Sequence, residues 1–429
     1  MVTPAPLAAS EPAGTRGFWA LILTQFQGAF SDNTLKWLVS YLVLGAGLTA
    51  SQRDLYFVLV VPLVFAVPFL LFSIPGGFLA DRFSKRDVAI ATKVMELGVM
   101  LLAAVALALN RLELAGAALF LACTQGALFG PTKYGLLPEL LPYERLSWGN
   151  GIIELTTLLA AIFGSLAGGL LATAFRGRQW ISGLILLAIS VVGWACSLGI
   201  SRLPARDPQR EFPWNWAADF WREWQRISFE KNLKRAVLAN TFFWFLGSLL
   251  LLNTVLYATD VLRTDEAHSS YLLAAVGLGI GIGSYVAGLA SGKTIESGMI
   301  LPGMTGIAVF ATLLSLPTLS FFWCLALLAL LGICGGFYVV PVNAWIQRIP
   351  RPEEKGRVIA VANLLSFIGV ALQPVAQFAL LRLGHPSPSR VYLLCGLLSL
   401  LAAASLALAD PALRLAALRW THLRRGASL

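Results

Sequence analysis

Charged residues are scarce in this chain of 429 residues. They make up 13% of the sequence and hydrophobic residues 57%, whereas a soluble domain carries roughly a quarter of its residues charged. The mean hydropathy of +0.74 agrees with this imbalance. The composition therefore excludes a water-soluble globular domain, and any charge inside an apolar stretch needs a polar partner or a polar cavity.

Cysteine and histidine are rare as well, with five and three residues. The cysteines lie singly inside apolar stretches, without a CxxC pair or a histidine at ligand spacing, so we expect neither disulfide bonds nor a metal site. There is no P-loop, and the glycines between 277 and 283 lie in an apolar run with no preceding strand, which favours helix packing over dinucleotide binding. His268 and His385 lack the acid of the acyltransferase HxxxxD motif. We therefore expect no enzyme and no cofactor.

Twelve apolar runs fill most of the sequence. Each is long enough for a helix to cross the roughly 30 Å hydrocarbon core of a bilayer, and none has the alternating pattern of a membrane β-strand. A polar insert, 201–235, divides them into six and six. The sequence therefore predicts an all-α polytopic membrane protein with spans at 19–44, 55–79, 88–109, 112–128, 152–174, 181–200, 236–258, 271–290, 299–316, 321–340, 358–380 and 391–409.

The net charge of +10 comes from basic residues scattered through short connections between the runs. No basic face with interleaved aromatic residues is present, so nucleic acid is not an expected partner. If both termini are cytoplasmic, that side holds 24 Lys and Arg residues, including Lys93, and the other side holds seven. By the positive-inside rule we expect a multi-pass protein of the cell inner (cytoplasmic) membrane with both termini in the cytoplasm.

The insert contains a tryptophan-rich stretch, 212–233, whose aromatic residues are interleaved with Arg and Glu. A helix of this kind suits the cytoplasmic headgroup layer, and a structural linker and a regulatory or partner-docking helix both remain open as its role. The predicted organisation is a first six-helix bundle at 1–203, a linker at 204–235, a second six-helix bundle at 236–410 and a basic tail at 411–429.

The two halves of the chain resemble each other. Gly77 and Gly288 are 211 positions apart, and Pro131 and Pro341 are 210 apart, so two matches share nearly one offset. Parallel six-helix repeats with a substrate site between the halves are the arrangement of major facilitator transporters.

The connection between the second and third runs resembles the signature loop G-x-x-x-D-R/K-x-G-R-R/K of that superfamily, with Ser84 in place of the usual second glycine. Gly76 and Gly77 would let two helices approach closely, and Asp81 would face the positive end of a neighbouring helix. The basic residues would lie against anionic headgroups. An ordinary basic cytoplasmic loop is the alternative. The resemblance implies a gating role for Gly77, Asp81, Arg82, Lys85 and Arg86.

Polar residues interrupt the first run near its middle, at Asp32, Asn33 and Lys36. A charge there costs roughly 2.5 to 3.5 kcal/mol on insertion scales, so these side chains should face a cavity or a partner. Asp32 and Lys36 are four residues apart on one helical face and could simply neutralise each other. For Lys133 and Glu154, at the ends of the fourth and fifth runs, a snorkelling lysine or a structural ion pair is the alternative.

Four motifs carry a closer resemblance. AFSDN in the first run, PTKYGLLPEL after the fourth, NGIIE at the start of the fifth and GGFYVVPVNAWIQ in the tenth are similar to those of the bacterial lysophospholipid transporters of the major facilitator superfamily. The resemblance implies a secondary transporter that moves lysophospholipid, of the lysophosphatidylethanolamine class, from the outer to the inner leaflet by alternating access, for reacylation by an acyltransferase. The family's basic residue midway along the seventh helix is missing. Either Lys36 replaces that charge from the facing repeat, or the headgroup preference differs.

For such a substrate, Lys133 would attract the phosphate, while Asp32 and Glu154 would meet an ammonium group or exchange protons. The expected partners are this substrate, membrane lipids and the acyltransferase. A proton-coupled exporter of amphiphilic drugs with the same fold is the alternative function. The expected substrate-binding residues are Asp32, Asn33, Lys36, Lys133, Tyr134, Asn150, Glu154, Asn343 and Gln347.

Overall fold

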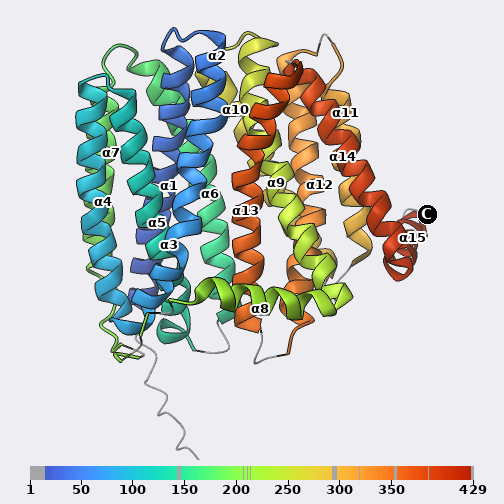
Figure 1. Ribbon diagram of the computed structural model, residues 1–429, viewed down its shortest axis with the longest axis horizontal. Coiled ribbons are helices and arrows are strands. Elements are labelled where there is room, and N and C mark those ends of the chain that lie inside the picture. Colours follow the sequence, from blue (N-terminus) through green and yellow to red (C-terminus); the bar gives the residue numbers. More distant parts are fainter. Residues whose placement is uncertain are drawn as a thin grey trace, which may run out of the picture. The chain divides into compact units, whose positions relative to one another are not determined.

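The structure is a computed structural model that describes residues 15–142, 146–205, 207–209, 211–212, 214–291, 297–317, 319–351, 355–384 and 386–426. Every regular element in these ranges is helical (Figure 1). The elements are α1 (Thr15–Gly45), α2 (Ala50–Arg53), the π-helix η1 (Asp54–Val60), α3 (Val61–Arg82), α4 (Lys85–Ala108), α5 (Leu112–Leu140), α6 (Leu146–Ala174), α7 (Trp180–Ser197), α8 (Trp216–Phe229), α9 (Lys231–Asp260), α10 (Glu266–Ser291), the 3-10 helix η3 (Ser297–Met299), α11 (Ile300–Leu314), α12 (Phe321–Arg348), α13 (Lys355–Gly384), α14 (Pro388–Ala409) and α15 (Pro411–Gly426).

The predicted helical class is confirmed. Among the described residues, eleven helical stretches are long and apolar enough to cross a membrane. The 31-residue α1 is not one of them, and Asp32 and Lys36 lie in its interior. The number of twelve spans therefore stays a prediction.

Helix α5 is longer than its apolar run indicates. It continues through Pro131 to Leu140, whereas hydropathy places the end of the run at residue 128. Proline is tolerated in a membrane helix where neighbouring groups satisfy the freed backbone carbonyl. Lys133 and Tyr134 consequently lie inside a helix, which fixes their directions more firmly than a loop would.

The chain forms two compact units, which we describe separately. Unit 1 comprises Met1–Asp32, Leu71–Ala160 and Trp180–Pro213, and unit 2 comprises Asn33–Leu70, Ala161–Gln179 and Trp214–Leu429. The boundary passes through the interior of α1, α3 and α6. Unit 2 thus combines the C-terminal parts of α1 and α6 with the helices of the second half of the chain.

Unit 1 packs α4 against both α5 and α7. At the contact between α4 and α7, a Cβ atom on Gly183 would lie 2.5 Å from Ala104 Cα, so the two backbones nearly touch. An apolar cluster around Phe18, Leu136 and Leu140 fills the space between α1 and the end of α5. Close packing of this kind holds the polar residues of α1 and α4 at fixed positions.

In unit 2, glycines bring α10 and α12 together. Cβ atoms on Gly279 and Gly283 would lie 2.2 Å from the backbone oxygens of Ala329 and Ile333, respectively, so both positions require glycine. A Cβ atom on Gly336 of α12 would likewise lie 2.3 Å from Ser284 N of α10. Small residues drive helix association in membranes because they allow such close approach. The expectation that glycines of this run pack helices is confirmed at these two positions.

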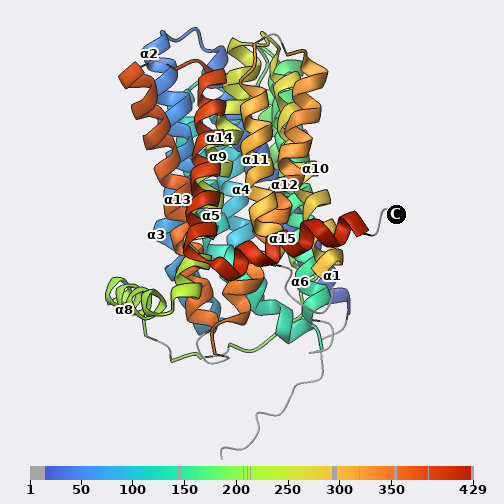
Figure 2. The same cartoon turned by 90° about the vertical axis from the view of Figure 1, so that its right-hand side faces the viewer.

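Helix α8 lies across the ends of α9 and α13 within unit 2 (Figure 1, Figure 2). It is shorter than the predicted stretch 212–233. Ile227 is buried against the core of the unit, and Glu223 Oε2 lies 3.5 Å from Arg357 Nε on α13. Trp214 and Phe229, at its two ends, are 84% and 88% exposed. The helix therefore has an anchored face and an exposed face, and its position in a headgroup layer stays a prediction.

The glycine contact predicts the cost of adding a side chain. Gly283→Ala should destabilise the protein by about 1–3 kcal/mol, because the new methyl group overlaps a backbone oxygen of α12 that cannot move alone. Gly288→Ala is the matched control on the same helix, since a Cβ there meets open space. Thermal unfolding of the purified variants should show a lower midpoint for Gly283→Ala only, and equal midpoints would contradict the contact.

Candidate functional site

A polar network is buried in unit 1 between α1 and α4. Lys93 Nζ donates to Glu96 Oε2 at 2.6 Å and to Gln27 Oε1 at 2.8 Å. The amide of Gln27 donates in turn to Glu96 Oε1 at 2.7 Å and to Ser31 Oγ at 2.9 Å. Lys93 and Glu96 are completely inaccessible to solvent. Lys93 and Glu96 therefore neutralise each other, and both form a hydrogen bond with the amide of Gln27.

Two glycines make room for this network. A Cβ atom on Gly28 would lie 2.7 Å from Lys93 Nζ, and one on Gly193 of α7 would lie 1.6 Å from Gln27 Oε1. A buried ion pair is tolerable only where hydrogen bonds satisfy its remaining atoms, since desolvation costs several kcal/mol per ion. The local sequence thus provides both the polar partners and the space between them.

Asp32 follows this network on α1. Its side chain is half-buried, and its Oδ1 atom is buried without a hydrogen-bond partner. The charges of Glu96, Lys93 and Lys133 all act on its carboxyl group. An unpaired buried carboxylate oxygen beside a satisfied ion pair is a ready acceptor for a hydrogen-bond donor or a cation.

Lys133 and Tyr134 on α5 belong to the same unit. Lys133 is half-buried, and its ammonium group lies 4.9 Å from the centroid of the Tyr134 ring, which is 43% exposed. The structure therefore brings Lys133 into the electrostatic surroundings of Asp32. Asn150 and Glu154 lie on α6, but their side chains are outside the described residues.

The other predicted binding residues lie in unit 2. Lys36 Nζ is 4.1 Å from the centroid of the Phe65 ring and 5.1 Å from that of Trp37, a geometry that stabilises a cation against aromatic faces. Asn33 is half-buried on the same helix, and Asn343 and Gln347 are exposed one turn apart on α12.

The sequence interpretation missed Lys93 and Glu96. It counted Lys93 among the cytoplasmic charges, whereas the structure places it inside α4 with no exposed surface. The predicted count of 24 Lys and Arg residues on the cytoplasmic side therefore falls by one. The available signal was a Lys and a Glu three residues apart inside an apolar run, the spacing at which helical side chains can pair.

The signature motif lies mostly on helix ends rather than in a loop, because α3 ends at Arg82 and α4 begins at Lys85. Its close approach occurs at Gly76, where a Cβ would lie 2.8 Å from the backbone oxygen of Ala127. At Gly77 a Cβ would meet open space, so the predicted packing role applies to Gly76 alone. The guanidinium of Arg82 lies 5.5 Å from the centroid of the Phe78 ring.

Lys85 is not directed to headgroups, which corrects the expectation for the basic residues of the motif. It is 3% exposed and forms an ion pair with Glu139 at the end of α5, while Gly135 makes room for its side chain. A cation removed from solvent needs such a partner. Arg86 donates to the backbone oxygen of Leu198 at 3.2 Å. Both residues therefore connect helices of unit 1.

A second polar region lies in unit 2 at the end opposite α8 (Figure 1). Here segments from the first half of the chain contact helices of the second half. Asp265 directly precedes α10. The backbone N–H of His268 donates to its carboxylate at 2.9 Å and holds the pKa of that group below its usual range. The connecting pairs are Arg53–Asp260 and Arg176–Glu266, both at 2.5 Å, Arg382–Ser51 at 2.9 Å and Tyr41–Ser270 at 3.0 Å.

The buried ion pair of unit 1 predicts a non-additive response to mutation. Lys93→Ala should cost about 3–5 kcal/mol, because it leaves the carboxylate of Glu96 buried without its cation. The double variant Lys93→Met/Glu96→Leu should lose less than the sum of the two single variants, since no uncompensated charge remains. Denaturation of the purified variants measures these losses, and additive losses would contradict the pairing.

The apolar helices define a class, that of polytopic helical membrane proteins. Solved transporter structures share the fold. A peptide transporter of the POT family in complex with alafosfalin superimposes with a TM-score of 0.73 at 14% identity, over 95% of this chain and 97% of that one. A POT family transporter in complex with a thioalcohol-conjugated peptide gives a TM-score of 0.67, also at 14% identity, over 93% and 96%.

Sequence comparison identifies the family. The model of the Major Facilitator Superfamily matches residues 21–374. The chain is 31% identical over 362 residues to the lysophospholipid transporter LplT of Klebsiella pneumoniae, covering 82% of this chain and 85% of that protein. The LplT of Cronobacter sakazakii is 31% identical over 361 residues with the same coverage. The chain belongs to the Major Facilitator Superfamily, in the family of these LplT proteins, which are transporters and not enzymes.

Proposed function

We propose that this protein is a secondary transporter of lysophospholipid, with lysophosphatidylethanolamine as the substrate class. The names of the LplT relatives support the substrate. The observation in this chain that carries the proposal is the unpaired buried Oδ1 of Asp32, next to a satisfied ion pair and within the field of Lys133.

The two residues have complementary roles in this proposal. Lys133 attracts the phosphate group as a mobile point charge. The free carboxylate oxygen of Asp32 accepts a hydrogen bond from the ammonium group of the substrate. Lys93 and Glu96 are satisfied by each other and by Gln27, so they act as positioning residues that hold α1 and α4 in register. The acyl chain stays in contact with apolar surface and lipid.

Transport runs from the outer to the inner leaflet of the inner membrane by alternating access, and the termini face the cytoplasm as the distribution of Lys and Arg indicates. An acyltransferase on the cytoplasmic side then removes the product by adding a second acyl chain. This reaction would draw transport inward without a coupling ion. The two predicted six-helix bundles are the parts that move in this scheme.

The proposal predicts that Asp32→Asn and Lys133→Ala each reduce uptake of labelled lysophosphatidylethanolamine at least about tenfold. Each variant removes one charge-assisted contact, of roughly 1.5–3 kcal/mol, from the headgroup. Uptake into liposomes containing the purified protein measures the effect. Lys231→Ala is the matched control, because Lys231 is exposed at the start of α9 in unit 2.

Insertion and folding of each variant should be checked by size-exclusion chromatography before uptake is compared. Wild-type uptake in both variants would rule out the site. Bacterial cells that overproduce the protein should show no added resistance to amphiphilic drugs, since an importer of lipid does not export drugs. Resistance together with absent lipid uptake would favour the drug-exporter alternative.

A further inference from the structure

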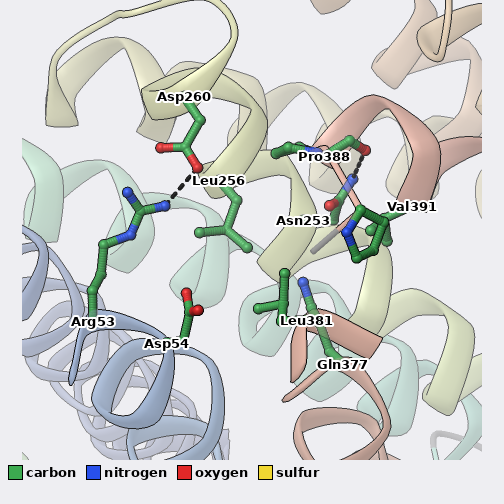
Figure 3. A pocket seen from close by; sticks show the side chains of 10 residues that line it. Arg53, Asp54, Asn253, Leu256, Asp260, Gln377, Leu381, Pro388 and Val391 are labelled. Atoms are coloured by element: carbon green, nitrogen blue, oxygen red, sulfur yellow. Dashed lines mark hydrogen bonds and ion pairs between the residues drawn. The ribbon is translucent and has the colours of Figure 1, made fainter. Parts of the chain in front are cut away.

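A pocket opens in unit 2 among α2, η1, α9, α13 and the start of α14, at the end opposite α8 (Figure 3). Its volume is about 320 Å³, including the part open to solvent. The proposed substrate site in unit 1 shares no residue with it. The lining residues are Arg53, Asp54, Asn253, Leu256, Asp260, Gln377, Leu381, Pro386, Pro388 and Val391.

Three polar atoms of this pocket are buried and lack a hydrogen-bond partner. Two are donors, Arg53 Nε and Gln377 Nε2, and one is an acceptor, Asn253 Oδ1. The side chains of Gln377 and Asn253 have no exposed surface. Since about 90% or more of buried polar groups are paired in folded proteins, three such atoms from three helices give this pocket the donors and the acceptor that a polar ligand would pair with.

The unpaired atoms are held in place by the other ends of their own side chains. Gln377 Oε1 accepts a hydrogen bond from Gln373 at 2.7 Å, and Asn253 Nδ2 donates to the backbone oxygen of Pro388 at 2.9 Å. Rotating the Asn253 amide by 180° would place its oxygen against the oxygen of Pro388, and rotating the Gln377 amide without that of Gln373 would place two donors against each other. The pocket therefore presents Gln377 as a donor and Asn253 as an acceptor.

Arg53 is held in a similar way. One terminal nitrogen of its guanidinium group lies 2.5 Å from Asp260 Oδ2, which leaves Nε for another acceptor. The chain changes from α-helix to π-helix directly after Arg53, at Asp54, whose carboxyl group also lines the pocket. Single π-helical segments inside α-helices are frequent at functional sites. Figure 3 shows the guanidinium group of Arg53 and the amide of Gln377 on opposite sides of the pocket, with the carboxylate of Asp54 near Arg53 and the amide of Asn253 near Gln377.

We propose that this pocket binds a phosphate ester whose alcohol carries a hydrogen-bond donor, such as phosphoethanolamine. The ester oxygens accept from Arg53 Nε and Gln377 Nε2, and the ammonium group donates to Asn253 Oδ1 and Asp54. The ester is either the headgroup of a lysophospholipid or a free soluble phosphate ester. If the ester is a lysophospholipid headgroup, the pocket is a headgroup-docking site separate from Asp32 and Lys133. This case rests on the proposed function.

The test measures binding of phosphoethanolamine to the purified full chain in phosphatidylcholine nanodiscs by isothermal titration calorimetry. Gln377→Glu keeps the acceptor for Gln373 and replaces the free donor by a negative acceptor, so affinity should fall roughly tenfold or more. Gln52→Glu is the matched control, because it adds the same charge on α2 without touching the pocket lining. Absent binding, or equal binding by both variants, would overturn the proposal.

A comparison of probes tests Asn253 without any variant. Phosphocholine carries the same phosphate but has no N–H group, so it should bind about fivefold or more weakly than phosphoethanolamine. Equal affinities would overturn the assignment of Asn253 as the acceptor. Displacement of phosphoethanolamine by lysophosphatidylethanolamine supports the lipid source, and failure to displace it overturns that source in favour of the soluble ester.

Uptake measured in parallel separates the two proposals. If phosphoethanolamine binds to the wild type but not to Gln377→Glu, and no lysophospholipid uptake is seen, the pocket proposal is supported and the proposed function is contradicted. If lysophospholipid is taken up but phosphoethanolamine does not bind, the proposed function is supported and the pocket proposal is contradicted.

Discussion

The cost of placing charge in an apolar interior is the constraint on which this structure depends. In unit 1, α4 carries a lysine and a glutamate that have no exposed surface, and a single amide from α1 bonds to both of them. The alternative to this arrangement is an unpaired ion, which is far more costly than any packing change nearby. The network therefore fixes the position of α1 relative to α4, and with it the position of the Asp32 carboxyl group one turn further along α1.

Much of the fold was predictable from hydropathy, because a bilayer imposes helix length and forces every backbone group to be bonded within its own segment. The ends of helices were less predictable. Apolar content ends at residue 128, but α5 continues to Leu140, since a helix can extend beyond the apolar layer wherever tertiary contacts support it. In the same way, Phe83 and Ser84 suffice to connect α3 and α4, although the motif around them suggested a longer loop.

The candidate site was predictable only in part. Asp32 and Lys133 were identifiable because a charge inside or beside an apolar run is expensive and so marks a function or a partner. The partner of a given charge depends on which helices adjoin, and the sequence does not contain this information directly. Lys93 and Glu96 were missed for that reason. Lys85 was assigned to headgroups, whereas its partner Glu139 is 54 residues away on another helix. The roles of Gly76 and Gly77 could be separated only once α3 was placed against Ala127 of α5.

Hydrogen-bond satisfaction separates the network of Lys93, Glu96 and Gln27 from the atoms proposed to bind ligand, whereas Arg86 and Glu139, which connect helices, each keep one unpaired buried atom. Lys93, Glu96 and Gln27 each have partners on a neighbouring helix, and a closed set of this kind holds helices together. Asp32 Oδ1 in unit 1 and Gln377 Nε2 in unit 2 are buried atoms that lack such a partner. Leaving a buried polar atom unpaired costs about 1–3 kcal/mol, and an apolar residue of similar size would avoid that cost at either position. The unpaired acceptor in unit 1 and the unpaired donors and acceptor in unit 2 are therefore the observations on which the two separate proposed sites depend.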